Sequence, residues 1–157
     1  MIRIQKILYP TDFSSYSNQA YFHAVSLAEK HGASLTVLFV YNADKTTTPG
    51  NPASLEEALA YWQSQLESIR PVDPTISVRH VLLEGDPADE IVHFGRDAAV
   101  DLIVMGTHGR TGLDRLLLGS VAEKVLREAN CSVLVVKLPK GIPATDPGDV
   151  QIAVGPA

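Results

Sequence analysis

The 157-residue sequence contains a single cysteine, Cys131, and therefore cannot form an internal disulfide. Because few cysteines are typical of proteins from a reducing compartment, we expect a cytoplasmic protein with Cys131 buried and inert. No apolar run approaches the ~20 residues that a membrane span requires. The first residues, "MIRIQKILYPTD", are strand-like and lack the apolar region and cleavage site of a signal peptide. These features exclude a role as a membrane-spanning protein.

The sequence also lacks a block of basic residues. Lysine and arginine total 13 against 18 aspartates and glutamates, which gives a formal net charge of -5. Proteins that bind nucleic acid through its phosphates usually present a basic surface, so nucleic acid is not an expected partner. Hydrophobic residues make up 45% and charged residues 20%, which is typical of one globular domain with a hydrophobic core.

Several common catalytic and cofactor motifs are missing. The first expected strand-to-helix turn, "YPTDFSS", contains no glycine, so the G-x-G-x-x-G dinucleotide motif is absent there. Neither a G-x-x-x-x-G-K-[ST] phosphate loop nor a G-x-S-x-G nucleophile elbow occurs. Four histidines lack metal-ligand spacing with other ligating residues: His23, His31, His80 and His93. The sequence therefore predicts no catalytic residues and no protein-only metal site.

Short apolar runs that alternate with amphipathic runs predict the order β-α-β-α-β-α-β-α-β. Strands are expected over 4–10, 34–41, 75–85, 101–106 and 131–137, and helices over 14–32, 54–69, 86–98 and 120–129. Ser54 with Glu57 forms a capping box, Asp86 with Pro87 begins a helix, and Gly32 ends one. Because the strands are apolar on both faces, we expect a doubly wound, Rossmann-like α/β domain with helices on both sides of a parallel sheet.

The stretch "GTHGRTGLDRLLLGS", residues 106–120, is named the glycine loop below. Gly106 ends a buried strand, and its missing Cβ would let a ligand approach the backbone. Gly109 and Gly112 can adopt positive φ and turn successive N–H groups inward. The Gly119-Ser120 pair begins a helix whose free N–H groups and dipole favour an anion. Since open α/β sheets bind ligands at the carboxyl ends of their strands, the glycine loop predicts a phosphate site there.

The pattern Gly106-x2-Gly109-x9-Gly119-Ser120 resembles the nucleotide-binding signature of the universal stress protein family, specifically its ATP-binding branch. The resemblance extends to "ILYPTDFS", "GDPADEI", "DLIVMGTHGRTGL" and "CSVLVVK", and covers roughly residues 3–137. It implies a five-stranded parallel sheet of order 3-2-1-4-5, a homodimer and a cytoplasmic role in the stress response. Residues 1–137 would form the nucleotide-binding domain, and 138–157 a C-terminal tail in which "VQIAV" (150–154) can add an edge strand.

The resemblance also implies roles for single residues. Asp12 resembles the family's acidic residue near the ribose and a bound metal ion. Val40 resembles the residue whose backbone pairs with the adenine edge. The other positions resemble the loop around the ribose and phosphates and the phosphate-binding helix start: Met105, Gly106, His108, Gly109, Arg110, Gly119, Ser120 and Val121. The implied ligand is ATP, together with Mg²⁺.

Simpler structural roles compete with some of these assignments. Asp12 can instead cap the first helix, as can Ser14 or Ser15, and His108 can be a solvent-exposed loop residue. Four acidic residues resemble paired catalytic carboxylates: Glu84, Asp86, Asp89 and Glu90. We expect a structural role instead, because Asp86 and Asp89 are placed for helix capping and the helix dipole.

Two classes of function fit these features. The first is an ATP-binding regulatory protein whose nucleotide state changes its protein partners, and the second is a slow ATP-hydrolysing or nucleotide-transferring enzyme of the same fold. A third alternative, a dimerising scaffold without nucleotide, is opposed by the intact signature. Because no catalytic pair is present, we expect a protein that holds ATP and is not an enzyme beyond slow hydrolysis. Its subunits are expected to meet at the apolar edge of the fifth strand.

Overall fold

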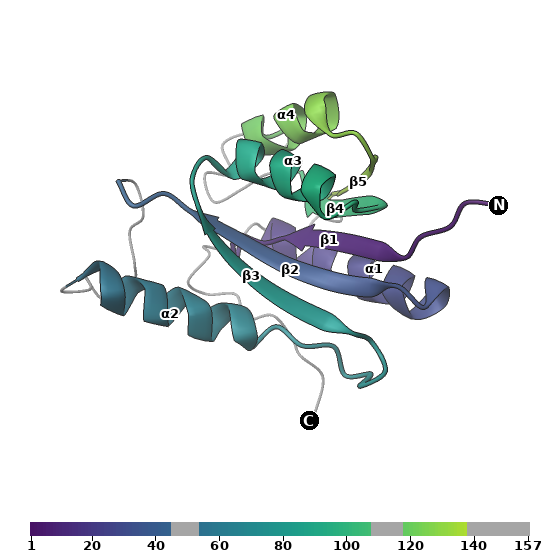
Figure 1. The fold of residues 1–157 in the computed structure, drawn as a ribbon, viewed down its shortest axis with the longest axis horizontal. Coiled ribbons are helices and arrows are strands. Elements are labelled where there is room, and N and C mark those ends of the chain that lie inside the picture. Colours follow the sequence, from purple (N-terminus) through teal and green to yellow (C-terminus); the bar gives the residue numbers. More distant parts are fainter. Residues whose placement is uncertain (45–53, 108–117, 138–157) are drawn as a thin grey trace.

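The computed structural model describes residues 1–44, 54–107 and 118–137. Its centre is a five-stranded, all-parallel sheet of order β3-β2-β1-β4-β5 (Figure 1). The strands are β1 (Lys6–Pro10), β2 (Ser34–Tyr41), β3 (Val78–Glu84), β4 (Leu102–Gly106) and β5 (Ser132–Val136). The helices are α1 (Ser15–His31), α2 (Leu55–Glu67), α3 (Pro87–Asp97) and α4 (Ser120–Glu128). The fold and strand order predicted from the sequence are confirmed.

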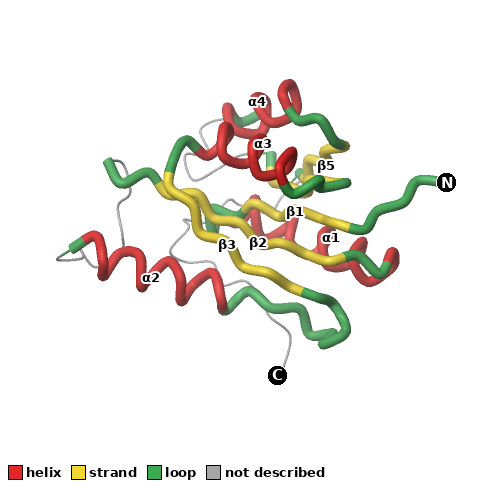
Figure 2. Tube along the Cα trace, in the orientation of Figure 1, coloured by secondary structure: helices red, strands yellow, loops and turns green. Residues whose placement is uncertain are grey.

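The helices form two layers, one on each face of the sheet (Figure 2). One hydrophobic core joins α1 and α2 to the sheet, and the other joins α3 and α4 to the opposite face. Successive residues of β1 alternate between the two cores: Ile7 and Tyr9 belong to the α1–α2 core, whereas Leu8 belongs to the α3–α4 core. This two-sided burial explains why the strands are nearly continuous apolar runs. Among the described helices, none has both the length and the apolar character needed to cross a bilayer.

Helix ends follow the sequence signals closely. The hydroxyl of Ser54 accepts a hydrogen bond from the Glu57 N–H (3.2 Å), and the Asp86 carboxylate accepts one from the Asp89 N–H (3.1 Å). Gly32 ends α1 in the left-handed conformation, with φ of 62°. These local interactions explain why the helices were correctly predicted.

The two largest errors are at the starts of β1 and β3, which begin two and three residues later than predicted because side chains bind the backbone groups there. The carboxylate of Asp101 accepts hydrogen bonds from the N–H groups of Gln5 and Lys6 (2.8 and 2.9 Å), so β1 begins only at Lys6. Asp73 accepts from the N–H and hydroxyl of Thr75 (2.8 and 2.6 Å), which forms a turn before β3. Such polar contacts compete with ladder pairing at strand ends.

Cys131 was predicted to begin the last strand, but it lies one residue before β5, and it is half-buried and not fully enclosed. Burial is the main cause that raises the pKa of its thiol, and the nearby Asp101 charge adds to the effect. A raised pKa keeps the thiol protonated and lowers its reactivity. The expectation of an inert cysteine therefore agrees with its surroundings, although the burial is incomplete.

Two buried tyrosines make the fold sensitive to alkaline pH. The Tyr9 and Tyr21 rings lie 5.6 Å apart, burial raises the pKa of Tyr21 to about 12, and burial also raises the pKa of Tyr9. Because both values lie above the ~10 of an unfolded tyrosine, their stabilisation is complete below that pH and is lost as pH rises. We expect the protein to unfold between about pH 10 and pH 12.

The measurement is a pH titration followed by tyrosinate absorbance and far-ultraviolet circular dichroism on the same sample. Ionisation of the buried tyrosines is expected to coincide with loss of helical signal, and the Tyr21→Phe variant is expected to unfold at higher pH. Complete tyrosine ionisation with an unchanged dichroism spectrum would contradict this prediction.

Candidate functional site

The predicted site residues that the structure describes lie at the carboxyl edge of the sheet. Asp12 follows β1, Val40 is in β2, and Gly106 ends β4. From this edge, α1 passes to one face of the sheet and α4 to the other. The neighbouring strands β1 and β4 therefore form the topological switch point, which is where doubly wound sheets bind their ligands.

Pro10 helps to end the pairing between β1 and β4 at this point. The pairing covers Ile7 with Leu102 and Leu8 with Ile103. The Asp101 N–H donates to the Lys6 carbonyl (2.9 Å), so Lys6, Leu8 and Pro10 direct their backbone groups toward β4. Because proline has no N–H, Pro10 cannot continue this ladder. Pro10 thus helps to separate β1 from β4 at the switch point.

Asp12 precedes the first helix but does not cap it. The N-cap of α1 is Ser14, whose hydroxyl accepts from the Ser17 N–H (3.3 Å). Asp12 instead accepts two hydrogen bonds at Oδ1, from the Ser14 N–H (2.9 Å) and the Ser17 hydroxyl (2.9 Å). Of the two roles considered for Asp12, helix capping therefore belongs to Ser14.

Phe13, next to Asp12, has a positive φ of 64°, which is unusual for a bulky residue. Its N–H donates to the Thr11 hydroxyl (3.0 Å), and its ring stacks on Trp62 of α2 with 5.3 Å between centroids. The Phe39 ring contacts both, at 4.9 and 4.7 Å. A conformation of this kind costs about 1–3 kcal/mol and persists only where surrounding packing holds it. The aromatic cluster therefore fixes the turn that carries Asp12, and no pattern in the sequence predicted this conformation.

The N–H and carbonyl of Val40 point toward β1, but β1 ends before it reaches the level of Val40. Ser34 and Leu38 bond toward β1, through the Gln5 carbonyl (2.9 Å) and the Thr11 N–H (2.8 Å). By the alternation of a strand, Val40 also directs its N–H and carbonyl to that side. After Thr11 the chain turns into α1, so the ladder has no further β1 residue for Val40. The Val40 side chain is buried in the α3–α4 core.

The structure describes both ends of the glycine loop, and the two ends meet. Met105 and Gly106 are buried and pair with Val135 and Val136 of β5. The Gly119 N–H donates to the Thr107 carbonyl (2.7 Å), which closes the loop at its base. The Met105 side chain lies in the α3–α4 core. The predicted residues His108, Gly109 and Arg110, with Gly112, lie outside the described residues.

The start of α4 has free backbone donors. Its N-cap, Gly119, has φ of -62° and ψ of 154° and supplies no side-chain hydrogen bond. The first helical hydrogen bond runs from the Glu123 N–H to the Gly119 carbonyl (2.9 Å), so the preceding N–H groups of the helix have no intrahelical partner. Ser120 is exposed and Val121 is half-buried. This terminus has the charge and donors that an anion requires.

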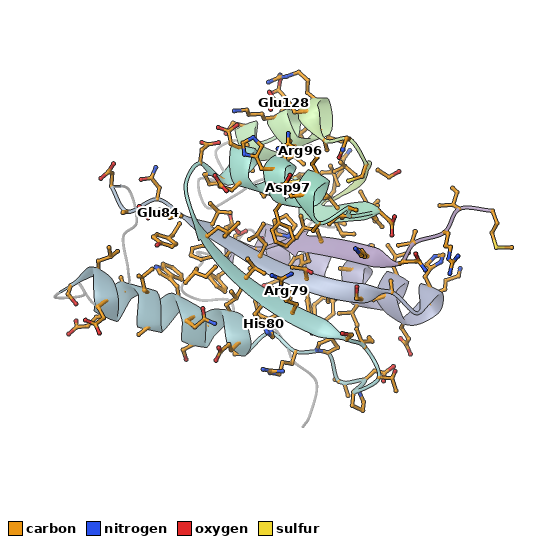
Figure 3. All side chains as sticks on the ribbon, viewed as in Figure 1. Arg79, His80, Glu84, Arg96, Asp97 and Glu128 are labelled. Carbon is orange, nitrogen blue, oxygen red and sulfur yellow. The ribbon has the colours of Figure 1, made fainter. Side chains whose placement is uncertain are left out.

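Asp86 and Asp89, at the start of α3, have the structural roles predicted for them. Asp86 caps α3, and Asp89 forms an ion pair with Lys124 that joins α3 to α4. The hydrogen bond from Lys124 lowers the pKa of Asp89. Glu90 packs against Gly85, where an added Cβ would lie 2.8 Å from its Cγ. Glu84 is exposed at the end of β3 (Figure 3).

No group of three or more potential metal ligands occurs in the described part of the chain. The Nδ1 of His23 lies 3.0 Å from the Gln19 carbonyl, and the Nε2 of His80 lies 2.8 Å from the Ile69 carbonyl. Figure 3 shows His80 on β3, away from the α3–α4 side of the sheet.

A groove lies at the opposite, amino edge of the sheet. It is lined by residues 1–5, the end of α1, and residues 75–77. Parallel α/β sheets bind ligands at their carboxyl edge, so this groove does not compete with the switch point as the candidate site.

The fold and site define a doubly wound α/β protein with anion-binding features at its switch point. The family model described as "Universal stress protein family" matches residues 3–137. Universal stress protein MJ0531 of Methanocaldococcus jannaschii is 41% identical over 144 residues, covering 87% of this chain and 84% of the relative. The chain belongs to the universal stress protein family.

Two further relatives support the same conclusion. Universal stress protein MJ0577 of M. jannaschii is 31% identical and covers 87% of this chain and 96% of its own length. Its solved structure has a TM-score of 0.66, with 89% of this chain and all of that chain covered. The structure of universal stress protein UspA from Lactobacillus plantarum has a TM-score of 0.69 at 26% identity and covers 86% of this chain and 99% of its own.

Proposed function

We propose that this protein binds ATP at the carboxyl edge of its sheet. The observation that carries the proposal is the Val40 backbone, which offers an N–H and a carbonyl where β1 has ended. An adenine edge presents an amino donor beside a ring-nitrogen acceptor, which complements this pair. Adenine would lie at Val40, and the ribose would lie near Asp12.

In this proposal, the triphosphate binds to the glycine loop and to the start of α4. Backbone N–H groups of Ser120 and Val121, the Ser120 hydroxyl and the α4 dipole supply favourable interactions with an anion. The backbone of Met105 and Gly106 would contact the ribose and phosphates. From the family signature, we assign His108, Gly109 and Arg110 to the same loop. Mg²⁺ would bind the phosphates with help from Asp12.

The proposed role is regulatory. The protein holds ATP in the cytoplasm, and its nucleotide state changes which protein partners it binds. The competing proposal is a slow ATP-hydrolysing or nucleotide-transferring enzyme of the same fold. The regulatory role is preferred because the proposed groups would bind phosphate in the ground and transition states alike. The sequence also shows no phosphate-loop lysine and no partner that would orient His108 as a general base.

The test of ATP binding begins with small molecules released from the purified protein on denaturation, identified by mass spectrometry. Adenine nucleotide is expected. Calorimetry on the nucleotide-free protein should then show ATP binding more tightly than GTP, because guanine places a carbonyl where adenine has its amino group. Equal affinity for both nucleotides would contradict the adenine position, and no binding of either would contradict the function.

We also propose a homodimer through the free edge of β5. The carbonyl of Val136 accepts from the Thr107 N–H (3.2 Å) on the β4 side, so Val133 and Val135 direct their backbone groups outward. The side chains of Val133, Leu134 and Val135 are half-buried in the single chain. An unpaired apolar edge is normally covered, and two-fold pairing with a second copy is a common way to cover it.

Val135→Pro is expected to weaken this dimer, because it removes an outward N–H without removing a bond to β4. Val135→Ala is the control, since it shortens the side chain and keeps the N–H. The parent and Val135→Ala are expected to be dimers at tens of micromolar in light scattering, which is above a Kd of ~1 μM. A monomeric parent, or equally stable dimers for both variants, would contradict the interface.

A further inference from the structure

Ser17 makes two hydrogen bonds to the same residue, Asp12. Its hydroxyl donates to the Asp12 carboxylate at Oδ1 (2.9 Å) and accepts from the Asp12 backbone N–H (3.1 Å). One hydroxyl can do both, because it has one donor and two acceptor sites. The two bonds fix the Asp12 backbone and its side chain relative to α1. Ser17 is only 5% exposed, so water competes little with this pair.

We propose that Ser17 is a positioning residue that orients the Asp12 carboxylate toward the nucleotide, an inference that rests on the proposed function. The Ser17 hydroxyl and the Ser14 N–H both donate hydrogen bonds to Oδ1 of Asp12. Oδ2 is the oxygen left to accept a hydrogen bond from a ribose hydroxyl. Hydrogen bonds to a charged carboxylate are stronger than neutral ones, so this pair restrains the side chain before the ligand binds.

Ser17 is itself held from two sides. Its N–H donates to the Ser14 hydroxyl (3.3 Å), and its carbonyl accepts from the Tyr9 hydroxyl (2.9 Å). Tyr9 is fully buried in β1, and burial raises the pKa of its hydroxyl, which keeps the group a neutral donor. The carboxylate is thereby connected through Ser17 to the rigid centre of the sheet.

A purely structural role for Ser17 predicts a different result from a positioning role. Serine side chains near helix starts often bond to local backbone groups, and such bonds stabilise the helix whether or not a ligand binds. If Ser17 acts through Asp12, its removal alters how the protein distinguishes ribose hydroxyls. If it only stabilises α1, its removal lowers the melting temperature and leaves that discrimination intact.

The test compares ATP with 2′-deoxy-ATP and 3′-deoxy-ATP by calorimetry on the full-length, nucleotide-free protein. The parent is expected to prefer ATP over the analogue that lacks the contacted hydroxyl. Ser17→Ala is expected to weaken ATP binding about tenfold and to remove most of this preference, because the carboxylate is no longer oriented. In an Asp12→Ala background, Ser17→Ala is expected to have no further effect on affinity.

Ser14→Ala is the matched control, because it removes the cap hydroxyl but keeps both donors to Oδ1, the Ser14 N–H and the Ser17 hydroxyl. The hydroxyl of Tyr9 still holds the Ser17 carbonyl in this variant. Ser14→Ala should lower the melting temperature through loss of the cap and keep the preference for ATP. Ser17→Cys fills nearly the same space with a weaker donor, so it tests the same bond if Ser17→Ala does not fold. Its preference for ATP is also expected to fall.

The outcomes separate this inference from the function on which it rests. A parent protein that binds none of the three nucleotides contradicts the proposed function. A parent that binds ATP with a clear ribose preference, together with an unchanged preference in folded Ser17→Ala or Ser17→Cys, overturns the positioning role alone. An equal loss of preference in Ser14→Ala and Ser17→Ala also overturns it, because it assigns the effect to the helix start.

Discussion

Gly119→Asp is expected to make the protein more stable while weakening ATP binding about 100-fold or more. Gly119 is the N-cap of α4, and its φ of -62° and ψ of 154° are accessible to aspartate without strain. An aspartate there can accept a hydrogen bond from the first turn, which the glycine cannot do. The gain over glycine is a few tenths of a kcal/mol from the cap, with up to about 1 kcal/mol from the helix dipole.

The same carboxylate would occupy the position proposed for a phosphate. Two negative charges about 4 Å apart repel by about 4 kcal/mol at an effective dielectric constant near 20. A 100-fold loss of affinity corresponds to about 2.8 kcal/mol, so the repulsion is large enough for the expected effect. The change in binding therefore has the opposite sign to the change in stability.

The Gly119→Asn variant separates the effect of the added negative charge from the effect of the added side chain, because asparagine caps a helix about as well as aspartate and is neutral. It should retain much more ATP affinity than Gly119→Asp, and the difference should shrink at high salt. Thermal unfolding measures the stability, and calorimetry measures the affinity. If Gly119→Asp bound ATP as tightly as the parent, the triphosphate could not lie at the start of α4.

The fold was predictable because local signals and burial agreed along the chain. Apolar strands such as 34–41 required cover on both faces, and the capping residues Ser54 and Asp86 marked helix starts that the structure confirms. Strand order came from the family resemblance. The largest errors are at the starts of strands, where side chains such as Asp101 and Asp73 take up backbone donors.

The geometry around Asp12 and Val40 was much less predictable. The free backbone of Val40 depends on where β1 ends relative to β2, and that register, Pro10 with Leu38, is not visible in composition or periodicity. The positive φ of Phe13 depends on contacts with Trp62, which comes from a distant helix. The hydrogen bond from Ser17 to Asp12 spans the turn at Phe13, so it depends in turn on this conformation. Sequence patterns therefore indicated which residues to propose for the site, whereas tertiary packing decides how the described ones are oriented.

Bound ATP is expected to be held for minutes or longer, and this separates a nucleotide-binding switch from an enzyme. Fast phosphoryl transfer requires groups that stabilise the transition state more than the ground state, and a residue that positions the attacking group. The α4 N–H groups and the Ser120 hydroxyl would interact with phosphate in both states. A lysine of the phosphate-loop type is absent from the sequence.

The two candidate bases also argue for slow turnover. Asp12 already accepts two hydrogen bonds at Oδ1, so this oxygen is occupied and is not free to take a proton from an attacking water. His108 is the only histidine of the glycine loop, and the sequence provides no neighbouring carboxylate at a spacing that would orient it. A single-turnover assay with labelled ATP and Mg²⁺ should therefore release ADP far more slowly than the ~1–10³ s⁻¹ typical of enzymes. The His108→Ala variant should release ADP at a similar slow rate. An enzyme-like rate that His108→Ala abolishes would instead assign the protein a catalytic function.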